Sequence, residues 1–209
     1  PFSDPVAEGI VIQKADERAL AAGTTTDKIF DMVESIQDKM HVPMVFMTYA
    51  NVIFVYGIEK FAKRSKEIGM SGVIIPDVPF EEKEEMDSVF SKYDLDVISL
   101  IAPTSHDRIQ AIAAEAKGFV YCVSSLGVTG MRSTINKGVA QMIEQVKKTK
   151  DIPCAIGFGI STPEQAKEMS EFSDGVIVGS AIVKLVETYG KECIKPVSEY
   201  VKSMKEAIS

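Results

Sequence analysis

Short apolar runs alternate along the chain with longer stretches in which apolar residues recur at helical spacing. The apolar runs are continuous and do not alternate with polar residues, which is typical of strands that are covered on both faces. Six such runs predict strands at residues 43–49, 72–75, 96–101, 118–123, 152–156 and 176–178. Because strands alternate with predicted helices, the pattern indicates βαβ units and a parallel sheet.

The stretches between the strands predict helices. These are expected at residues 13–22, 27–40, 58–68, 81–93, 105–116, 137–148, 181–189 and 197–208. One more helix should begin at Ser161-Thr162-Pro163-Glu164, which offers a hydroxyl N-cap, a proline in the first turn and a glutamate placed for a capping box. The residues before this series, PFSDPVAEGIVIQ, are rich in proline, serine, aspartate and glycine and predict a loop.

Six strands are two fewer than a closed (β/α)8 barrel needs, and 209 residues are fewer than the ~250 typical of that fold. We therefore predict an α/β fold, a (β/α)8 TIM barrel of which residues 1–209 supply strands 3–8. In this interpretation the chain is a single, N-terminally incomplete barrel domain, and a strand–helix–strand segment would precede Pro1. The alternative is a complete six-stranded open sheet of the doubly wound kind.

Glycines follow the last two predicted strands. The first of these strands ends at Gly157-Phe158-Gly159 and the second at Gly179-Ser180, and a helix start follows each. Glycines at such turns let a phosphate approach the backbone N–H groups, and the helix dipole favours its charge. Two consecutive turns of this kind predict the phosphate site that (β/α)8 barrels carry after their last two strands. The alternative is that both are ordinary glycine turns.

Composition narrows the class of protein. A net charge of −7 argues against a surface for nucleic acid or anionic lipid, and no apolar run is long enough for a transmembrane helix. Three widely spaced cysteines suggest buried thiols in a reducing cytoplasm. The two histidines have no metal-ligand spacing, so we predict no metal site and no histidine-based catalysis.

Ionisable and phenolic side chains are few at the predicted strand ends, where parallel α/β folds place their chemistry. They are Asp4, Glu8, Tyr49, Asp77 and Tyr121. A carboxylate among them can act as a general base, and a tyrosine can hydrogen-bond a substrate. The loop 126–130, with two glycines and a threonine, is long enough to act as a lid.

Six motifs occur in order and at suitable intervals: PFSDPVAEG, MTYAN, PDVPFEE, SSLGVTG, IGFGIS and GSAIVK. Together, over essentially the whole chain, they resemble the tryptophan synthase alpha subunit family, the indole-3-glycerol-phosphate lyases. The resemblance implies a barrel that cleaves indole-3-glycerol phosphate to indole and glyceraldehyde 3-phosphate by a retro-aldol reaction with acid–base catalysis, in tryptophan biosynthesis. It implies a cytoplasmic alpha2-beta2 heterotetramer in which the beta subunit receives the indole. Pyridoxal phosphate is expected only in that partner, and no cofactor in this chain.

The resemblance also assigns site residues. The catalytic residues would be Glu8 and Tyr121, the latter near the glycerol moiety. Glycine and serine backbone would bind the phosphate at Gly130, Gly159, Gly179 and Ser180. The indole pocket would be lined by Ile12, Tyr49, Phe158 and Ile177. Thr129 would lie in the lid, and the partner interface would include Asp4, Asn51 and Asp77.

The chain departs from the family pattern in the opening motif. The family's general acid–base glutamate would precede Pro1 and is therefore absent from this sequence. Glu8 stands where the family has an aspartate, which stabilises positive charge on the indole nitrogen, and Ile10 stands where a proline is usual. One extra methylene predicts a slow enzyme, since a misplacement of about 1 Å can cost about 10²-fold. Compensating backbone shifts would instead restore the distance.

Two further functions stay open on the sequence. A catalytically weak or inactive barrel would bind a phosphate ligand and act as a regulatory partner of the beta subunit. A sugar-phosphate isomerase or epimerase is the third candidate, but no lysine or histidine stands at a predicted strand end to support it.

Overall fold

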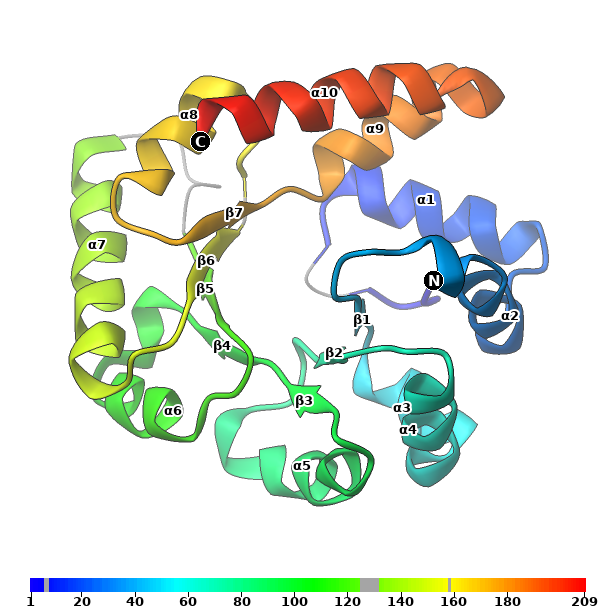
Figure 1. Cartoon of the computed structure of the whole chain (residues 1–209), viewed down its shortest axis with the longest axis horizontal. Helices are drawn as coiled ribbons and strands as arrows, with labels where there is room; N and C mark the ends of the chain where they lie inside the picture. Colours follow the sequence, from blue (N-terminus) through cyan, green and yellow to red (C-terminus); the bar gives the residue numbers. More distant parts are fainter. Residues whose placement is uncertain (6–7, 125–131, 158) are drawn as a thin grey trace. The chain divides into compact units, whose positions relative to one another are not determined.

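The computed structural model describes residues 1–5, 8–124, 132–157 and 159–209. The chain divides into two compact units, one of residues 1–8 and 13–98 and the other of residues 9–12 and 99–209. In both units every described strand pair is parallel, and helices separate most successive strands along the chain (Figure 1). No helix within the described residues is long and apolar enough to cross a bilayer.

The first unit contains a sheet in the order β1-β2-β3. Its strands are β1 (Val45–Met47), β2 (Gly72–Ile74) and β3 (Asp96–Val97). The α-helices in this part of the chain are α1 (Ile10–Ala21), α2 (Thr26–Ile36), α3 (Ala50–Tyr56), α4 (Ile58–Glu67) and α5 (Lys83–Phe90). Short 3-10 turns are η1 (Gln37–Lys39), η2 (Phe80–Glu82) and η3 (Ser91–Tyr93).

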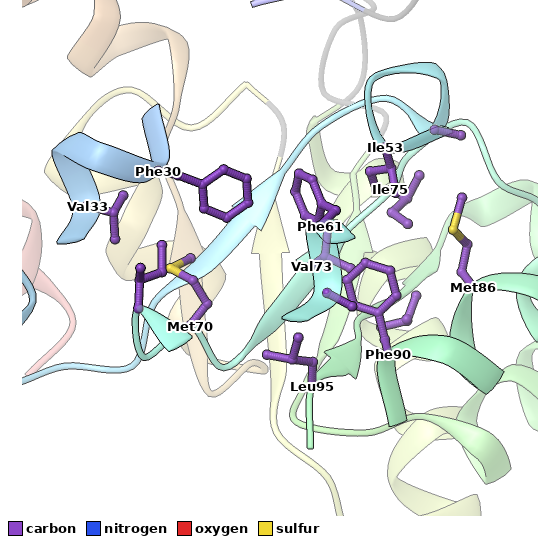
Figure 2. Packing of buried hydrophobic residues seen from close by; sticks show 14 residues of the cluster. Phe30, Val33, Ile53, Phe61, Met70, Val73, Ile75, Met86, Phe90 and Leu95 are labelled. Atoms are coloured by element: carbon purple, nitrogen blue, oxygen red, sulfur yellow. The ribbon is translucent and has the colours of Figure 1, made fainter. Parts of the chain in front are cut away.

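Aromatic side chains fill the core of the first unit. Phe30 of α2, Phe61 of α4 and Phe90 of α5 are all almost fully buried and belong to one hydrophobic cluster with Val73 of β2 (Figure 2). The rings of Phe30 and Phe61 meet edge to face with centroids 5.2 Å apart, a favoured geometry for aromatic pairs. The apolar stripes of three helices thus contribute to one core, as their helical spacing predicts.

The second unit contains a sheet in the order β4-β5-β6-β7. Its strands are β4 (Ser99–Ile101), β5 (Val120–Val123), β6 (Cys154–Gly157) and β7 (Gly175–Ile177). The helices are η4 (Pro103–Arg108), α6 (Ile109–Glu115), α7 (Arg132–Thr149), α8 (Pro163–Ser170), α9 (Ser180–Tyr189), η5 (Gly190–Glu192) and α10 (Ile194–Ala207). α10 packs on α8 and α9, and α6 packs on α7 (Figure 1).

All six predicted strands are present, with one difference. The run 96–101 is divided at Ile98, so that its first part pairs with β2 and its second part pairs with β5. The N–H of Ile98 still donates to the carbonyl of Val73 at 2.9 Å, which carries the pairing with β2 to the point of division.

Three helices differ most from the prediction. α7 begins at Arg132, five residues before the predicted start at residue 137. α1 begins at Ile10, inside the predicted loop, because the N–H of Ile12 bonds the carbonyl of Gly9 and starts the first turn. Ile10 therefore occupies the first helical position, which accepts proline without loss of a hydrogen bond. α3 was not predicted, since five of the seven residues of its sequence ANVIFVY are β-branched or aromatic, types that favour strands.

Two strands that share the sequence Gly-Val-Ile give a matched pair of variants. A Cβ at Gly72 of β2 would overlap the backbone carbonyl of Asp96 in β3, whereas a Cβ at Gly175 of β7 would meet nothing within 4 Å. We expect Gly72→Ala to lower the free energy of unfolding by about 2–3 kcal/mol, because backbone cannot move aside as a side chain can. Gly175→Ala should change it by less than about 0.5 kcal/mol. Urea denaturation of the two variants checks this, and equal effects would contradict it.

An ion pair between Lys147 and Asp174 stabilises the start of β6. Asp174 Oδ2 accepts hydrogen bonds from the N–H of Cys154 and from Lys147 Nζ, both at 2.7 Å. Burial acts to raise the pKa of the Asp174 carboxyl, but the hydrogen bonds from Lys147 and the Cys154 N–H outweigh it and hold this pKa below its usual value. The contact therefore stabilises the fold when the carboxyl is ionised.

The pH dependence of this stabilisation follows from the sign of the shift. A pKa lower in the folded state gives stability that is present above the unfolded value, about 3.9, and is lost as the pH falls through the folded value. At pH 7 we expect Asp174→Asn to cost about 1 kcal/mol, since the side chain is 48% exposed and solvent screens the pair. The difference from wild type should shrink below about pH 4. Urea denaturation at pH 7, 5 and 3 measures it, with the exposed Asp38→Asn as the control; a difference that does not vary with pH would refute the assignment.

Candidate active site

In the first unit the structure brings together two of the predicted site residues, Glu8 and Tyr49. Tyr49 follows β1, is 7% exposed, and donates from its phenol Oη to Glu8 Oε1 at 3.0 Å. The Tyr49 ring is also stacked on Phe2, with centroids 5.0 Å apart and an interplanar angle of 30°. On the other side of Glu8, Gln13 Nε2 donates to its backbone carbonyl at 2.8 Å. A carboxylate and a phenol thus meet beside the end of β1.

Two of the three residues predicted for the partner interface, Asp77 and Asp4, accept local hydrogen bonds in the structure. Both carboxylate oxygens of Asp77, which follows β2, accept from the N–H of Ala50 at 3.0 and 3.2 Å. This caps the start of α3, where backbone N–H groups lack helical acceptors. Asn51 is the next residue of α3 and is exposed. Asp4 is exposed, and its Oδ2 accepts from Ser3 Oγ at 2.6 Å. All three are placed in the first unit.

In the second unit Tyr121 lies against Gly157 of the neighbouring strand. Tyr121 is 8% exposed, and a Cβ built at Gly157 would overlap its phenol oxygen and ring. The strands are held in register by parallel pairing, in which Tyr121 lies opposite Ala155. The absence of a side chain at Gly157 therefore makes the space that the Tyr121 phenol occupies.

Ser124 extends the pairing of β5 and β6 towards the glycine turn. Its backbone N–H and its Oγ both donate to the carbonyl of Gly157, at 3.0 and 3.1 Å, and the residue is fully buried. Two bonds to one carbonyl fix the end of β6 immediately before the turn at Gly159. The buried hydroxyl of Ser124 therefore has a hydrogen-bond partner, and the same bond fixes the position of Gly157.

The two predicted phosphate turns connect strands to helices as expected. After β6, Gly159 has a φ of +81°, a left-handed conformation that side chains disfavour. Thr162 then caps α8 in a capping box with Gln165, so the box partner is Gln165 and not the predicted Glu164. Tyr200 Oη of α10 donates to the carbonyl of Ser161 at 2.9 Å and holds this loop.

The second turn places a helix N-terminus directly after β7. Ile177 ends the strand, Gly179 caps α9, and Ser180 is the first residue of the helix. The carbonyl of Gly179 accepts from the N–H groups of Ile182 and Val183 at 3.0 and 3.2 Å, which starts the helix at once. Two helices thus begin within a few residues of glycine-ended strands, the arrangement that suits an anion.

The remaining predicted site residues are distributed as follows. Thr129, Gly130 and Phe158 lie outside the described residues. Ile12 is half-buried in α1 and belongs to the second unit, as do Tyr121 and the two glycine turns. Glu8 and Tyr49 belong to the first.

Sequence reasoning missed the supporting residues Phe2 and Gln13. Phe2 is the first aromatic residue of an otherwise polar and proline-rich opening, which could have marked it as an anchor. Gln13 carried no comparable signal. The roles of Ser124 and Gly157 depend on contacts 33 to 36 positions apart along the chain, which no local pattern indicates.

The strand cysteines are structural. Cys122 and Cys154 are fully buried on adjacent strands, and Cys193 is half-buried. Contact with the Cys154 thiol, together with burial, raises the pKa of Cys122, so this thiol stays protonated. This confirms the prediction of buried thiols for the two strand cysteines.

Parallel strands separated by helices define an α/β protein, and glycine turns after the last two strands are typical of (β/α)8 barrels. Comparison with known proteins makes the assignment specific. The pattern of the family described as "Tryptophan synthase alpha chain" matches residues 1–209. The chain belongs to the tryptophan synthase alpha chain family.

Individual relatives agree with this. The tryptophan synthase alpha chain of Lacticaseibacillus casei is 45% identical over 208 residues, which cover 100% of this chain and 78% of the relative. The solved tryptophan synthase subunit alpha of Legionella pneumophila is 37% identical with a TM-score of 0.87, covering 100% of this chain and 79% of that one. A chain of the tryptophan synthase complex from Pyrococcus furiosus is 30% identical with a TM-score of 0.86, covering 99% and 84%. The predicted family is therefore confirmed, and the fold class is the (β/α)8 barrel rather than a doubly wound open sheet.

Proposed function

We propose that this chain cleaves indole-3-glycerol phosphate to indole and glyceraldehyde 3-phosphate, as a carbon–carbon lyase of tryptophan biosynthesis. The observation that carries the proposal is the Glu8–Tyr49 pair, a carboxylate held by a buried phenol at 3.0 Å, in a chain of the tryptophan synthase alpha chain family. A carboxylate fixed in this way suits the stabilisation of a cation that forms only during reaction.

The chemistry is a retro-aldol cleavage. Protonation of the indole ring at C3 leaves positive charge on the ring nitrogen, and the Glu8 carboxylate stabilises that charge. The bond between C3 and the glycerol carbon then breaks, its electron pair returns to the ring, and the hydroxyl on that carbon loses its proton and becomes the aldehyde of glyceraldehyde 3-phosphate. Tyr121 lies by the glycerol moiety. In the family pattern, the general acid–base glutamate stands just before the PFSDP motif.

Separate groups of residues bind the phosphate and the indole ring of the substrate. The phosphate is bound by Gly130, Gly159, Gly179 and Ser180. Of these, the turns at Gly159 and Gly179 carry the glycine and helix-start features that favour an anion. The indole ring is lined by Ile12, Tyr49, Phe158 and Ile177, and Thr129 lies in a lid over the substrate.

The partner is the beta subunit, in an alpha2-beta2 heterotetramer of the cytoplasm. Asp4, Asn51 and Asp77 contribute to the interface, and the exposure of Asp4 and Asn51 is compatible with this. The reaction needs no cofactor in this chain, and pyridoxal phosphate belongs to the partner. Residues 1–209 form part of one barrel domain, which is supported by the single family match across both compact units.

Indole release from indole-3-glycerol phosphate, measured on the full-length natural protein with and without a beta subunit, tests the proposal. We expect indole to form and its rate to rise when the subunit is added. Tight binding of the phosphate ligand with no indole under either condition would instead support the second candidate, a regulatory barrel. The replacement of the family aspartate by Glu8 is the observation that favours that candidate.

A further inference from the structure

Tyr49 contacts the opening loop at two points. Its ring stacks on Phe2, near the start of the loop, and its phenol oxygen donates to the Glu8 carboxylate, at the loop's end. Tyr49 itself is 7% exposed and directly precedes α3, whose first N–H is fixed by Asp77. Tyr49 is therefore a buried residue that contacts Phe2 and Glu8, near the two ends of the opening loop.

The length of the Glu8 side chain matters for this contact. The carboxylate reaches Tyr49 Oη at 3.0 Å while Gln13 holds the backbone carbonyl of the same residue at 2.8 Å. Backbone and side chain of Glu8 are thus fixed by separate partners. An aspartate on the same backbone would end one carbon–carbon bond, about 1.5 Å, short of the phenol.

We infer that Tyr49 is a positioning residue for Glu8: its hydroxyl sets where the longer carboxylate lies, beyond any contact its ring makes with substrate. The inference rests on the proposed function, because it concerns the carboxylate that the reaction uses. It deepens that function by making the Tyr49 hydroxyl and the length of Glu8 interdependent. The hydroxyl then acts on turnover through Glu8, whereas the ring contributes to substrate binding.

The variant Tyr49→Phe removes the hydroxyl and keeps the ring. We expect kcat for indole release by the full-length natural protein to fall about tenfold, with KM changed less than about threefold, because a displaced catalytic group costs turnover more than binding. The matched control is Tyr93→Phe, which removes a phenol that donates to Glu59 Oε1 at 2.6 Å in an exposed contact before β3. That control should stay within about twofold of wild type.

A double-mutant cycle separates positioning from a general structural effect. In a Glu8→Gln background, Tyr49→Phe should lower kcat by less than about twofold further, because the group that it positions no longer carries charge. Equal effects of Tyr49→Phe in both backgrounds would overturn the inference. Thermal denaturation of each variant checks folding. Should Tyr49→Phe fail to fold, Phe2→Leu, which removes the stack and keeps the hydroxyl, is expected to lower kcat severalfold in the Glu8 background only.

The results of these experiments distinguish failure of the positioning role of Tyr49 from failure of the proposed lyase function. Wild-type protein that releases no indole overturns the proposed function and the positioning role with it. Active wild-type protein in which Glu8→Gln lowers turnover but Tyr49→Phe does not leaves the function standing and refutes the positioning role alone.

Discussion

Replacement of Glu8 by glutamine is expected to lower kcat for indole release by about 10²- to 10³-fold, with a much smaller change in KM. The substitution keeps the size of the side chain and an oxygen that can accept from Tyr49, so the contact at 3.0 Å can persist. What it removes is the negative charge that, in the proposed mechanism, faces the cation forming on the indole nitrogen. A preorganised group facing developing charge is commonly worth this much, and its loss appears in kcat rather than in ground-state binding.

The control for this variant is Glu34→Gln, which makes the same chemical change on the exposed side of α2. It should leave kcat within about twofold of wild type. Steady-state kinetics on the full-length natural protein measure both. A Glu8→Gln enzyme with wild-type kcat would show that the carboxylate takes no part in the reaction.

The structure also bears on whether Glu8 slows the enzyme relative to an aspartate. Because the Glu8 carboxylate is held by Tyr49, the contact favours compensation for the extra methylene. Glu8→Asp should therefore not raise kcat. A variant faster than wild type would mean that the longer side chain impairs catalysis after all.

Gly157→Ala is expected to lower kcat/KM by about 10²-fold and the free energy of unfolding by about 1–3 kcal/mol. The new Cβ would occupy the space of the Tyr121 phenol, and parallel pairing of β5 with β6 prevents the strands from separating. The tyrosine must then leave its position, and overpacking in a close-packed core costs this amount of stability. A displacement near 1 Å in the site is sufficient for the loss of activity.

Two further variants identify the cause. Gly175→Ala in β7 adds the same methyl group where nothing lies within 4 Å, and it should change neither quantity appreciably. In the Tyr121→Ala background, Gly157→Ala should lower the free energy of unfolding by less than it does in wild type. The reason is that the side chain which the new Cβ would overlap is no longer there. The activity of the double variant should not recover. Additive losses of stability would show that Gly157 acts through something other than Tyr121.

The strands and the start of α8 could be predicted because their signals are local. Continuous apolar runs such as 118–123 mark buried parallel strands, and Thr162 before Pro163 marks a helix start, whatever the rest of the chain does. α3 shows where local signals fail. Its β-branched and aromatic sequence favours a strand, yet burial of Ile53 and the capping of Ala50 by a distant carboxylate make it a helix.

Some features of the candidate site also have local sequence signals, whereas others depend on the fold. The glycine turns at Gly159 and Gly179 could be predicted, since each lies between a strand and a helix start that the sequence marks. The pairing of Glu8 with Tyr49 could not, because 41 positions separate them and only the fold brings them together. The space for Tyr121 likewise depends on the register of two strands and not on either sequence alone.

Single-turnover analysis tests the central claim most directly. Full-length natural protein in excess over one equivalent of indole-3-glycerol phosphate, with the beta subunit present, should yield indole and glyceraldehyde 3-phosphate in equal amounts, each approaching one equivalent. Substrate that is bound but recovered intact would contradict the lyase assignment and leave the chain as a phosphate-binding partner.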